Sequence, residues 1–147
     1  MSDIITYGFD PEFFAVDKEN KVISPAIMEL MFGLKPVKRK RDLKHPIYID
    51  NNEFSWIMDG VAFELTSKVI FSKPKDMQNL VKNALGELQN LLDKYNLSLY
   101  TKPVVDFDLK WMKYSDNEKV LQGLIFGCDP DRDAILPGYT CETLNVA

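Results

Sequence analysis

"FSWIMDGVAFEL", residues 54–65, is the stretch that decides the fold. Asp59-Gly60 is a favoured dipeptide for a two-residue type I′ turn, and an alternating apolar run lies on each side of it. The pattern predicts a β-hairpin in which Met58 faces Val61 across the turn. The apolar face of this hairpin would carry Phe54, Trp56, Met58, Val61, Phe63 and Leu65.

The opposite face of the predicted hairpin contains an acid. Because side chains alternate along a strand, Glu64 points away from the apolar face. Its neighbours on that face would be Ser55, Ile57 and Ala62. A carboxylate in the middle of a strand is therefore expected on the side of the sheet away from the core.

A long amphipathic helix is predicted over residues 75–95, after the hairpin. Ser72 and Pro74 suit its start, and Asn96 suits its end. Its apolar stripe follows helical spacing and consists of Met77, Leu80, Val81, Ala84, Leu85, Leu88, Leu91, Leu92 and Tyr95. This stripe is interpreted as core.

The remaining segments complete an α+β prediction. Residues 13–16 and 21–24 flank the polar turn "DKEN" and suggest another hairpin. Residues 98–109 read as an edge strand because Pro103 cannot donate to a central ladder, and residues 117–126 fit either a strand or a short helix. We expect one domain over residues 1–147, with an antiparallel sheet of hairpins and one long helix on one face.

Composition indicates a folded protein from a reducing compartment. Of the 147 residues, 46% are hydrophobic and 12% aromatic, which is ample for a core. The apolar runs are far too short to span a membrane, and the N-terminus does not resemble a secretory signal. Cys128 and Cys141 form neither a disulfide framework nor a metal-ligand pair. The expected location is the cytoplasm.

Positive charge is concentrated in one segment. Residues 35–44, "KPVKRKRDLK", carry six basic residues and one acid, so the net charge of −4 leaves −9 for the rest of the chain. A solvated loop and a site for the phosphates of a small ligand are both compatible with this segment. Nucleic acid is not expected as a partner, since no aromatic residue interleaves the cations and the remainder is acidic.

A second acid, Glu12, stands in "GFDPEFFAVD", residues 8–17, at the start of an apolar segment. Carboxylates on the open face of a sheet suit Mg²⁺, which binds to a few carboxylates together with phosphate oxygens. Ordinary solvent-facing strand residues explain the same spacing. Residue spacing alone favours the latter interpretation of Glu12 and Glu64.

Four segments resemble the phage-type carboxylate–amine ligases, the amidoligases related to glutamine synthetase and glutamate–cysteine ligase. The resemblance covers the N-terminal half of that family. "GFDPEFFAVDKENKVISPA" resembles its opening Gly-x-Asp-Pro-Glu motif, and "GLKPVKRKR" its Gly-x-Lys segment. "DGVAFEL" resembles the strand with the second acid, and "FGCDPDRDA" a later Gly-Cys-Asp-Pro-Asp motif.

The resemblance implies an incomplete glutamine-synthetase-like sheet that binds magnesium and ATP. Glu12 and Glu64 would be ligands of Mg²⁺, while Lys35, Lys38 and Arg39 would face phosphate. Family members transfer the γ-phosphate of ATP to a carboxylate, and an amine then displaces it to form an amide. The substrates implied are a small-molecule carboxylate and an amine.

The chain departs from the family in its later motifs. A glycine-rich His-x-His segment and later arginines are missing, His45 lies in the wrong place, and Thr66 replaces the usual asparagine. We therefore expect a split enzyme that needs a second-half chain, a truncated form, or a decayed copy. "CDPDRDA" is not an EF-hand, because the sixth and twelfth positions are Ala134 and Thr140.

An alternative interpretation is a non-catalytic phage structural or accessory protein, located in the virion or in the host cytoplasm. Open sheet edges pair with other chains. A protein assembly could then form through the sheet edge and through a basic surface. The basic residues of that surface would be Lys38, Arg39, Lys40 and Arg41.

Overall fold

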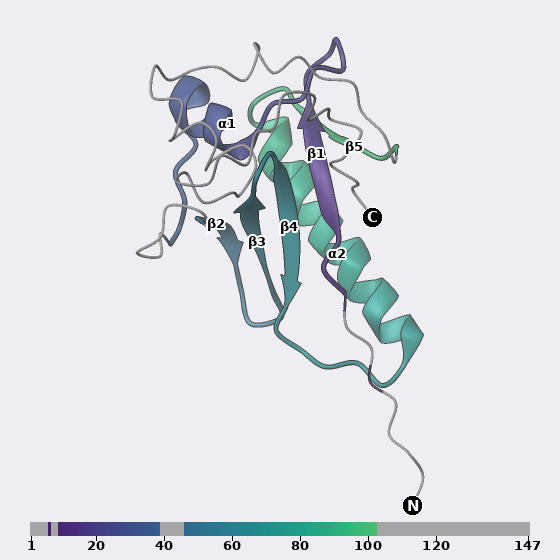
Figure 1. Ribbon diagram of the computed structural model, residues 1–147. Coiled ribbons are helices and arrows are strands. Elements are labelled where there is room, and N and C mark those ends of the chain that lie inside the picture. Colours follow the sequence, from purple (N-terminus) through teal and green to yellow (C-terminus); the bar gives the residue numbers. More distant parts are fainter. Residues whose placement is uncertain (1–5, 7–8, 39–45, 103–147) are drawn as a thin grey trace, which may run out of the picture.

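The computed structural model describes residue 6 and residues 9–38 and 46–102, which form an antiparallel sheet with helices (Figure 1). The strand order is β2-β3-β4-β1-β5, and every pairing is antiparallel. The α+β prediction is confirmed for this part of the chain. The elements are β1 (Glu12–Val16), α1 (Pro25–Phe32), β2 (Ile47–Asp50), β3 (Phe54–Asp59), β4 (Ala62–Ser67), α2 (Pro74–Asp93) and β5 (Ser98–Tyr100).

The β3–β4 hairpin forms as predicted, but its register is shifted by two residues. Asp59 pairs with Ala62, and Met58 pairs with Phe63 instead of Val61. The turn is therefore Gly60-Val61, in which Gly60 has a φ of 55°. Glycine at the first turn position is what a type II′ turn requires, whereas a type I′ turn needs positive φ at two residues. A shift of two preserves the faces of both strands, so Glu64 still points away from Trp56.

Helix α2 covers one face of the sheet, as predicted (Figure 1). The indole Nε1 of Trp56 donates a hydrogen bond of 2.9 Å to the carbonyl of Ala84, in the middle of the helix. The fully buried stripe of the helix is Leu80, Ala84, Leu88 and Leu92. Pro74 occupies the first turn of the helix, and Asn96 adopts a φ of 57° just after its end. The start differs in one respect, since the N-cap is Lys73 rather than Ser72.

The hairpin predicted from residues 13–16 and 21–24 forms only in part: the Ile23 amide donates to the Ala15 carbonyl at 2.9 Å, but residues 21–24 do not make a strand. Val22 makes only an isolated bridge to Val16, and a helix begins three residues later. The Ser24 side chain accepts a hydrogen bond from the amide of Ile27, and Pro25 follows it. A serine N-cap with proline behind it starts a helix, and this signal outweighs the strand-like pattern.

Helix α1 lies on the same face of the sheet as α2. The Tyr48 hydroxyl donates to the Glu29 carboxylate in α1, and the Tyr48 ring packs edge-on against Phe63. At the other end of the helix, Phe32 contacts the ring of Tyr95, just beyond α2. Neither of these two helices therefore covers the face of the sheet that carries Glu64.

The two outer strands are short. The sequence analysis did not assign β2, whose ladder with β3 contains an irregularity between Ile47 and Ile49. β5 is the edge strand of the predicted segment 98–109, and its Leu99 amide donates to the Gln89 side chain at 3.0 Å. The rest of that predicted strand, residues 103–109, lies outside the described residues, as does the predicted segment 117–126. The prediction of a single domain over residues 1–147 therefore also covers residues that are not described.

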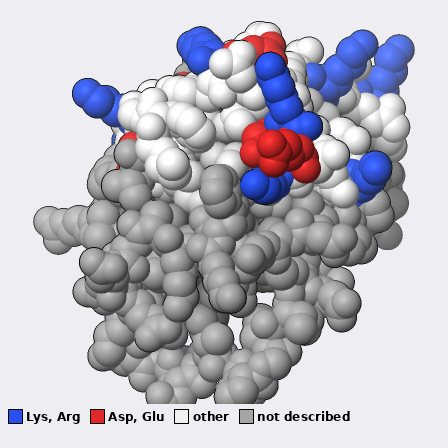
Figure 2. All heavy atoms as spheres, turned by 90° about the horizontal axis from the view of Figure 1, so that it is seen from above, with Lys and Arg blue, Asp and Glu red and all other residues white. Residues whose placement is uncertain are grey.

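The described surface carries mixed charge. The end of the molecule that points up in Figure 1 has acidic and basic side chains next to one another (Figure 2). An ion pair of 3.3 Å joins Lys21 to Glu19 in the turn after β1. Within the described part of the chain, no helix is long and apolar enough to cross a membrane.

Candidate metal site

Glu12 and Glu64 lie directly opposite each other on neighbouring strands. Glu12 is the first residue of β1, and the antiparallel ladder between β1 and β4 pairs it with Glu64. Next to this pair, the amide of Leu65 donates to the Pro11 carbonyl at 3.0 Å, which fixes the start of β1 against β4. Like charges directly opposite each other in a ladder are destabilising. The fold thus keeps an arrangement that costs stability.

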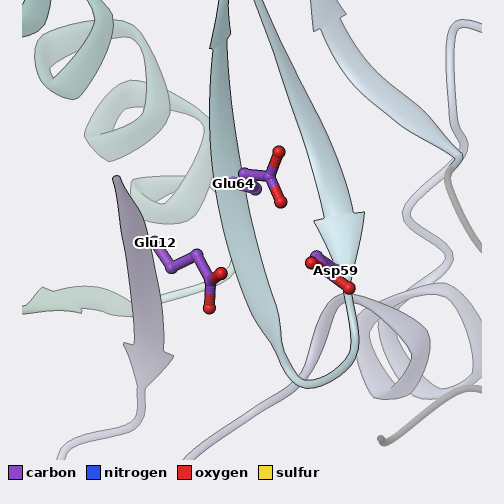
Figure 3. A group of neighbouring side chains, drawn as sticks. All are labelled: Glu12, Asp59 and Glu64. Atoms are coloured by element: carbon purple, nitrogen blue, oxygen red, sulfur yellow. The ribbon is translucent and has the colours of Figure 1, made fainter. Parts of the chain in front are cut away.

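Asp59 completes a group of three carboxylates. One oxygen from each of Glu12, Asp59 and Glu64 lies within 4.8 Å of the others, and all three residues are half-buried. The side chains come from three adjacent strands and gather near the β3–β4 turn (Figure 3). Together they form what we call the acidic trio.

The register of the β3–β4 hairpin explains why Asp59 belongs to the trio. In the predicted register Asp59 was a turn residue, whereas the structure makes it the last residue of β3. Glu64 pairs with Ile57, and Asp59 stands two residues further along the same strand face. Sequence analysis missed Asp59 for this reason. Its spacing of two residues from Ile57, which places both side chains on one face of a strand, was the signal that could have found it.

The trio is electrostatically crowded. Burial, a hydrogen bond with Asp59 and charge repulsion from Asp59 together raise the pKa of Glu64 to about 7. Burial also raises the pKa of Glu12, with further contributions from the charges of Asp59 and Asp10. Near neutral pH the site therefore favours a positive partner, either a proton or a cation, because its carboxylates cannot all be charged without cost.

Chemically, three carboxylates on one sheet face can hold a hard divalent cation. Mg²⁺ prefers oxygen ligands and usually keeps several positions for water or phosphate. The side chains of Glu12, Asp59 and Glu64 would be the protein ligands. All three residues are partly exposed, so water or phosphate oxygens could complete the coordination of such an ion.

The predicted phosphate-binding residues are not part of the trio. Lys38 forms an ion pair with Asp50 of β2, and strand β3 lies between β2 and the strand of Glu64. Lys35 is exposed. Arg39, Lys40 and Arg41 lie outside the described residues, as do His45, Cys128, Cys141 and the 129–134 segment.

Comparison with known proteins gives no relative for this chain. No protein-family model matches it, and neither a curated protein nor a solved structure does. Its function has to be argued from its own residues and their geometry.

Proposed function

We propose that this chain is the metal- and ATP-binding half of an ATP-dependent carboxylate–amine ligase. In this proposal Glu12, Asp59 and Glu64 hold Mg²⁺ on an incomplete glutamine-synthetase-like sheet. A second-half chain supplies the histidine and arginine segments that the motif pattern lacks. Substrates are a small-molecule carboxylate and an amine.

One observation carries the proposal: the opposed pair of Glu12 and Glu64. The two acids stand 52 positions apart in the sequence, and each belongs to a separate motif. A pair of solvent-facing acids has no reason to occupy the same rung of a ladder, where they repel each other. A shared cation turns that repulsion into attraction, which is a physical reason for the arrangement.

The chemistry of phosphoryl transfer fits such a site. Catalysis of this step consists largely of positioning and of charge stabilisation, and a metal ion bridging phosphate oxygens supplies much of both. The trio would orient the ion on a rigid sheet. Lys35, Lys38 and Arg39 follow α1 in the sequence and would compensate further phosphate charge.

Magnesium binding to the full-length chain tests the proposal. We expect Glu12→Gln, Asp59→Asn and Glu64→Gln each to weaken Mg²⁺ binding at least about tenfold, since even the outer-shell partners of metal ligands cost this much. Isothermal titration calorimetry at pH 8 should measure the effect, with Mg²⁺ alone and with Mg-ATP. Above pH 7 competition from the proton on Glu64 is reduced.

Glu53→Gln is the matched control. Glu53 is an exposed acid in the turn between β2 and β3, outside the trio, so its loss removes the same charge without removing a ligand. Equal Mg²⁺ affinity in the native chain and in all three trio variants would contradict the metal assignment. Loss of Mg²⁺ binding in the trio variants alone would support it.

A second candidate is the non-catalytic phage structural or accessory protein. The observation that favours it is a set of exposed apolar side chains in and just before the basic segment: Met31 is 61% exposed, Phe32 42% and Val37 60%. Apolar and basic side chains in one stretch suit an acidic protein partner. Under this proposal the trio has no cation to hold, so its variants would leave Mg²⁺ binding unchanged.

A further inference from the structure

A second charged cluster lies on the same sheet face as the acidic trio. Its centre is Asp50, at the end of β2, whose carboxylate accepts hydrogen bonds from three side chains. Ser55 donates its hydroxyl at 2.6 Å, and Lys38 and Lys68 each donate from their ammonium groups. Lys68 also donates to the Asn51 carbonyl at 2.6 Å. Four separate parts of the chain thus meet at one carboxylate.

The strand registers place this cluster relative to the trio. Asp50 pairs with Ser55, and Ser55, Ile57 and Asp59 alternate along one face of β3. That face also carries Glu64, opposite Ile57. From Asp50 to Glu64 the separation is about 7 Å along the strands and about 10 Å across them, from standard sheet spacings. One extended ligand, or two ligands side by side, can therefore touch both clusters.

The cluster has an excess of positive charge. Two lysines against one carboxylate leave a formal charge of +1, and these partners hold the pKa of Asp50 well below its usual range. The side chain of Asp50 is only 13% exposed, whereas those of Lys38 and Lys68 are 65% and 37% exposed. The carboxylate thus lies beneath the lysines, and the ammonium groups are reached from solvent.

The two lysines retain capacity for a further acceptor. An ammonium group has three donors. Among the described residues, Asp50 and Asn51 account for one donor of Lys38 and two of Lys68. Both nitrogens contact the same carboxylate, so an anion of the size of phosphate or carboxylate can contact both of them.

We propose that Lys38 and Lys68, held together by Asp50, form an anion-binding subsite for the substrate complex on the sheet face of the acidic trio. The proposal rests on the proposed function for the identity of the complex. Its ligand is a phosphate or carboxylate group, and Lys68 enters as a binding residue that no sequence motif indicated. Asp50 is a positioning residue, because it fixes the two ammonium groups next to each other.

Binding of simple anions to the full-length chain tests the subsite. The probes are inorganic phosphate, glutarate and Mg-ATP. Their binding is measured by calorimetry or by chemical-shift titration. We expect Lys38→Met and Lys68→Met each to weaken binding of at least one probe about tenfold, the effect of losing one charge-assisted hydrogen bond. Methionine keeps the apolar stem of the side chain, which protects the fold.

Lys82→Met is the matched control, since Lys82 is an exposed lysine on α2. Weakening of phosphate and Mg-ATP alone would assign the subsite to the nucleotide, and weakening of glutarate alone to the carboxylate substrate. Unchanged affinity for all three probes in both lysine variants, with native circular dichroism, would overturn the subsite.

The two proposals fail separately. Glu64→Gln should lower the affinity for Mg²⁺ and leave the affinity for inorganic phosphate unaltered, whereas Lys68→Met should do the reverse. Phosphate binding that depends on Lys68, in a chain whose trio binds no Mg²⁺, would leave an anion subsite and remove the ligase proposal. If the trio binds Mg²⁺ but Lys38→Met and Lys68→Met leave the affinity for every anion unchanged, the metal site remains and the anion subsite is removed.

Discussion

Glu64 shows how a single residue is placed at a cost in stability. It is half-buried, it faces Glu12 on the next strand, and it shares a hydrogen bond with Asp59. Each of these features disfavours its charged form. A strand at this position would be more stable with a neutral side chain, so the carboxylate has to be explained by something other than folding.

The pH dependence of stability measures this cost. The pKa of Glu64 rises from 4.5 to about 7 on folding, so between these values the folded state binds more protons than the unfolded state. The free energy of unfolding therefore falls as pH rises through this window and levels off above it. We expect Glu64→Gln to be more stable than the native chain by about 1–2 kcal/mol at pH 8, after allowance for solvent screening, and equally stable near pH 4.

Urea unfolding followed by circular dichroism, between pH 4 and pH 8 and with a chelator present, measures the difference. Glu53→Gln should keep the native pH profile, since its carboxylate is exposed and outside the trio. A Glu64→Gln profile that coincides with the native one would show that Glu64 does not carry the cost. Addition of Mg²⁺ at pH 8 should stabilise the native chain in proportion to its binding.

At the scale of elements, two serines near helix starts have different roles. Ser24 caps α1 by accepting a hydrogen bond of 3.2 Å from the Ile27 amide, whereas Lys73, the N-cap residue of α2, makes no side-chain cap. We expect Ser24→Ala to lower the free energy of unfolding by about 1 kcal/mol. Ser72→Ala should change it by less than about 0.5 kcal/mol, as for other exposed positions. Thermal or urea denaturation of the two variants compares them directly, and equal effects would contradict the assignment of the cap.

Strong local patterns made part of the fold predictable. The stripe of α2 and the alternation on both sides of Asp59-Gly60 each repeat over many residues, so the helix and the hairpin were predicted correctly. The sheet face to which Glu64 points was also predicted correctly, because a register shift of two residues does not change the face of any side chain. The exact register did not follow, because Gly60 serves equally well at either turn position and cross-strand packing makes the choice.

The remaining elements depend on contacts that a sequence pattern does not contain. β2 has only four residues and is defined by its ladder with β3. Helix α1 was not predicted because the run after Pro25 contains only one polar residue, Glu29, which is too few to reveal a helical period. Two of the three members of the trio, Glu12 and Glu64, were predicted from the sequence. Asp59 was not, because the predicted register placed it in the turn.

At the scale of the whole molecule, the indole of Trp56 links strand β3 to the long helix α2. Trp56 is fully buried, and its Nε1 donates to the Ala84 carbonyl. We expect Trp56→Phe to lower the free energy of unfolding by about 2–3 kcal/mol, through the lost hydrogen bond and the smaller ring. Urea unfolding monitored by far-ultraviolet circular dichroism measures this change. A loss below about 0.5 kcal/mol would show that the layers do not depend on this contact.

The Gln89 side chain gives the molecule a further property. Its amide accepts from the Leu99 N–H and donates at 3.3 Å to the Leu97 carbonyl, so it offers β5 the same two partners that a neighbouring backbone would offer. An incoming strand from another molecule would have to break both bonds before forming its own. Within the described part of the chain, the glutamine therefore protects the β5 edge against pairing with a strand of another molecule.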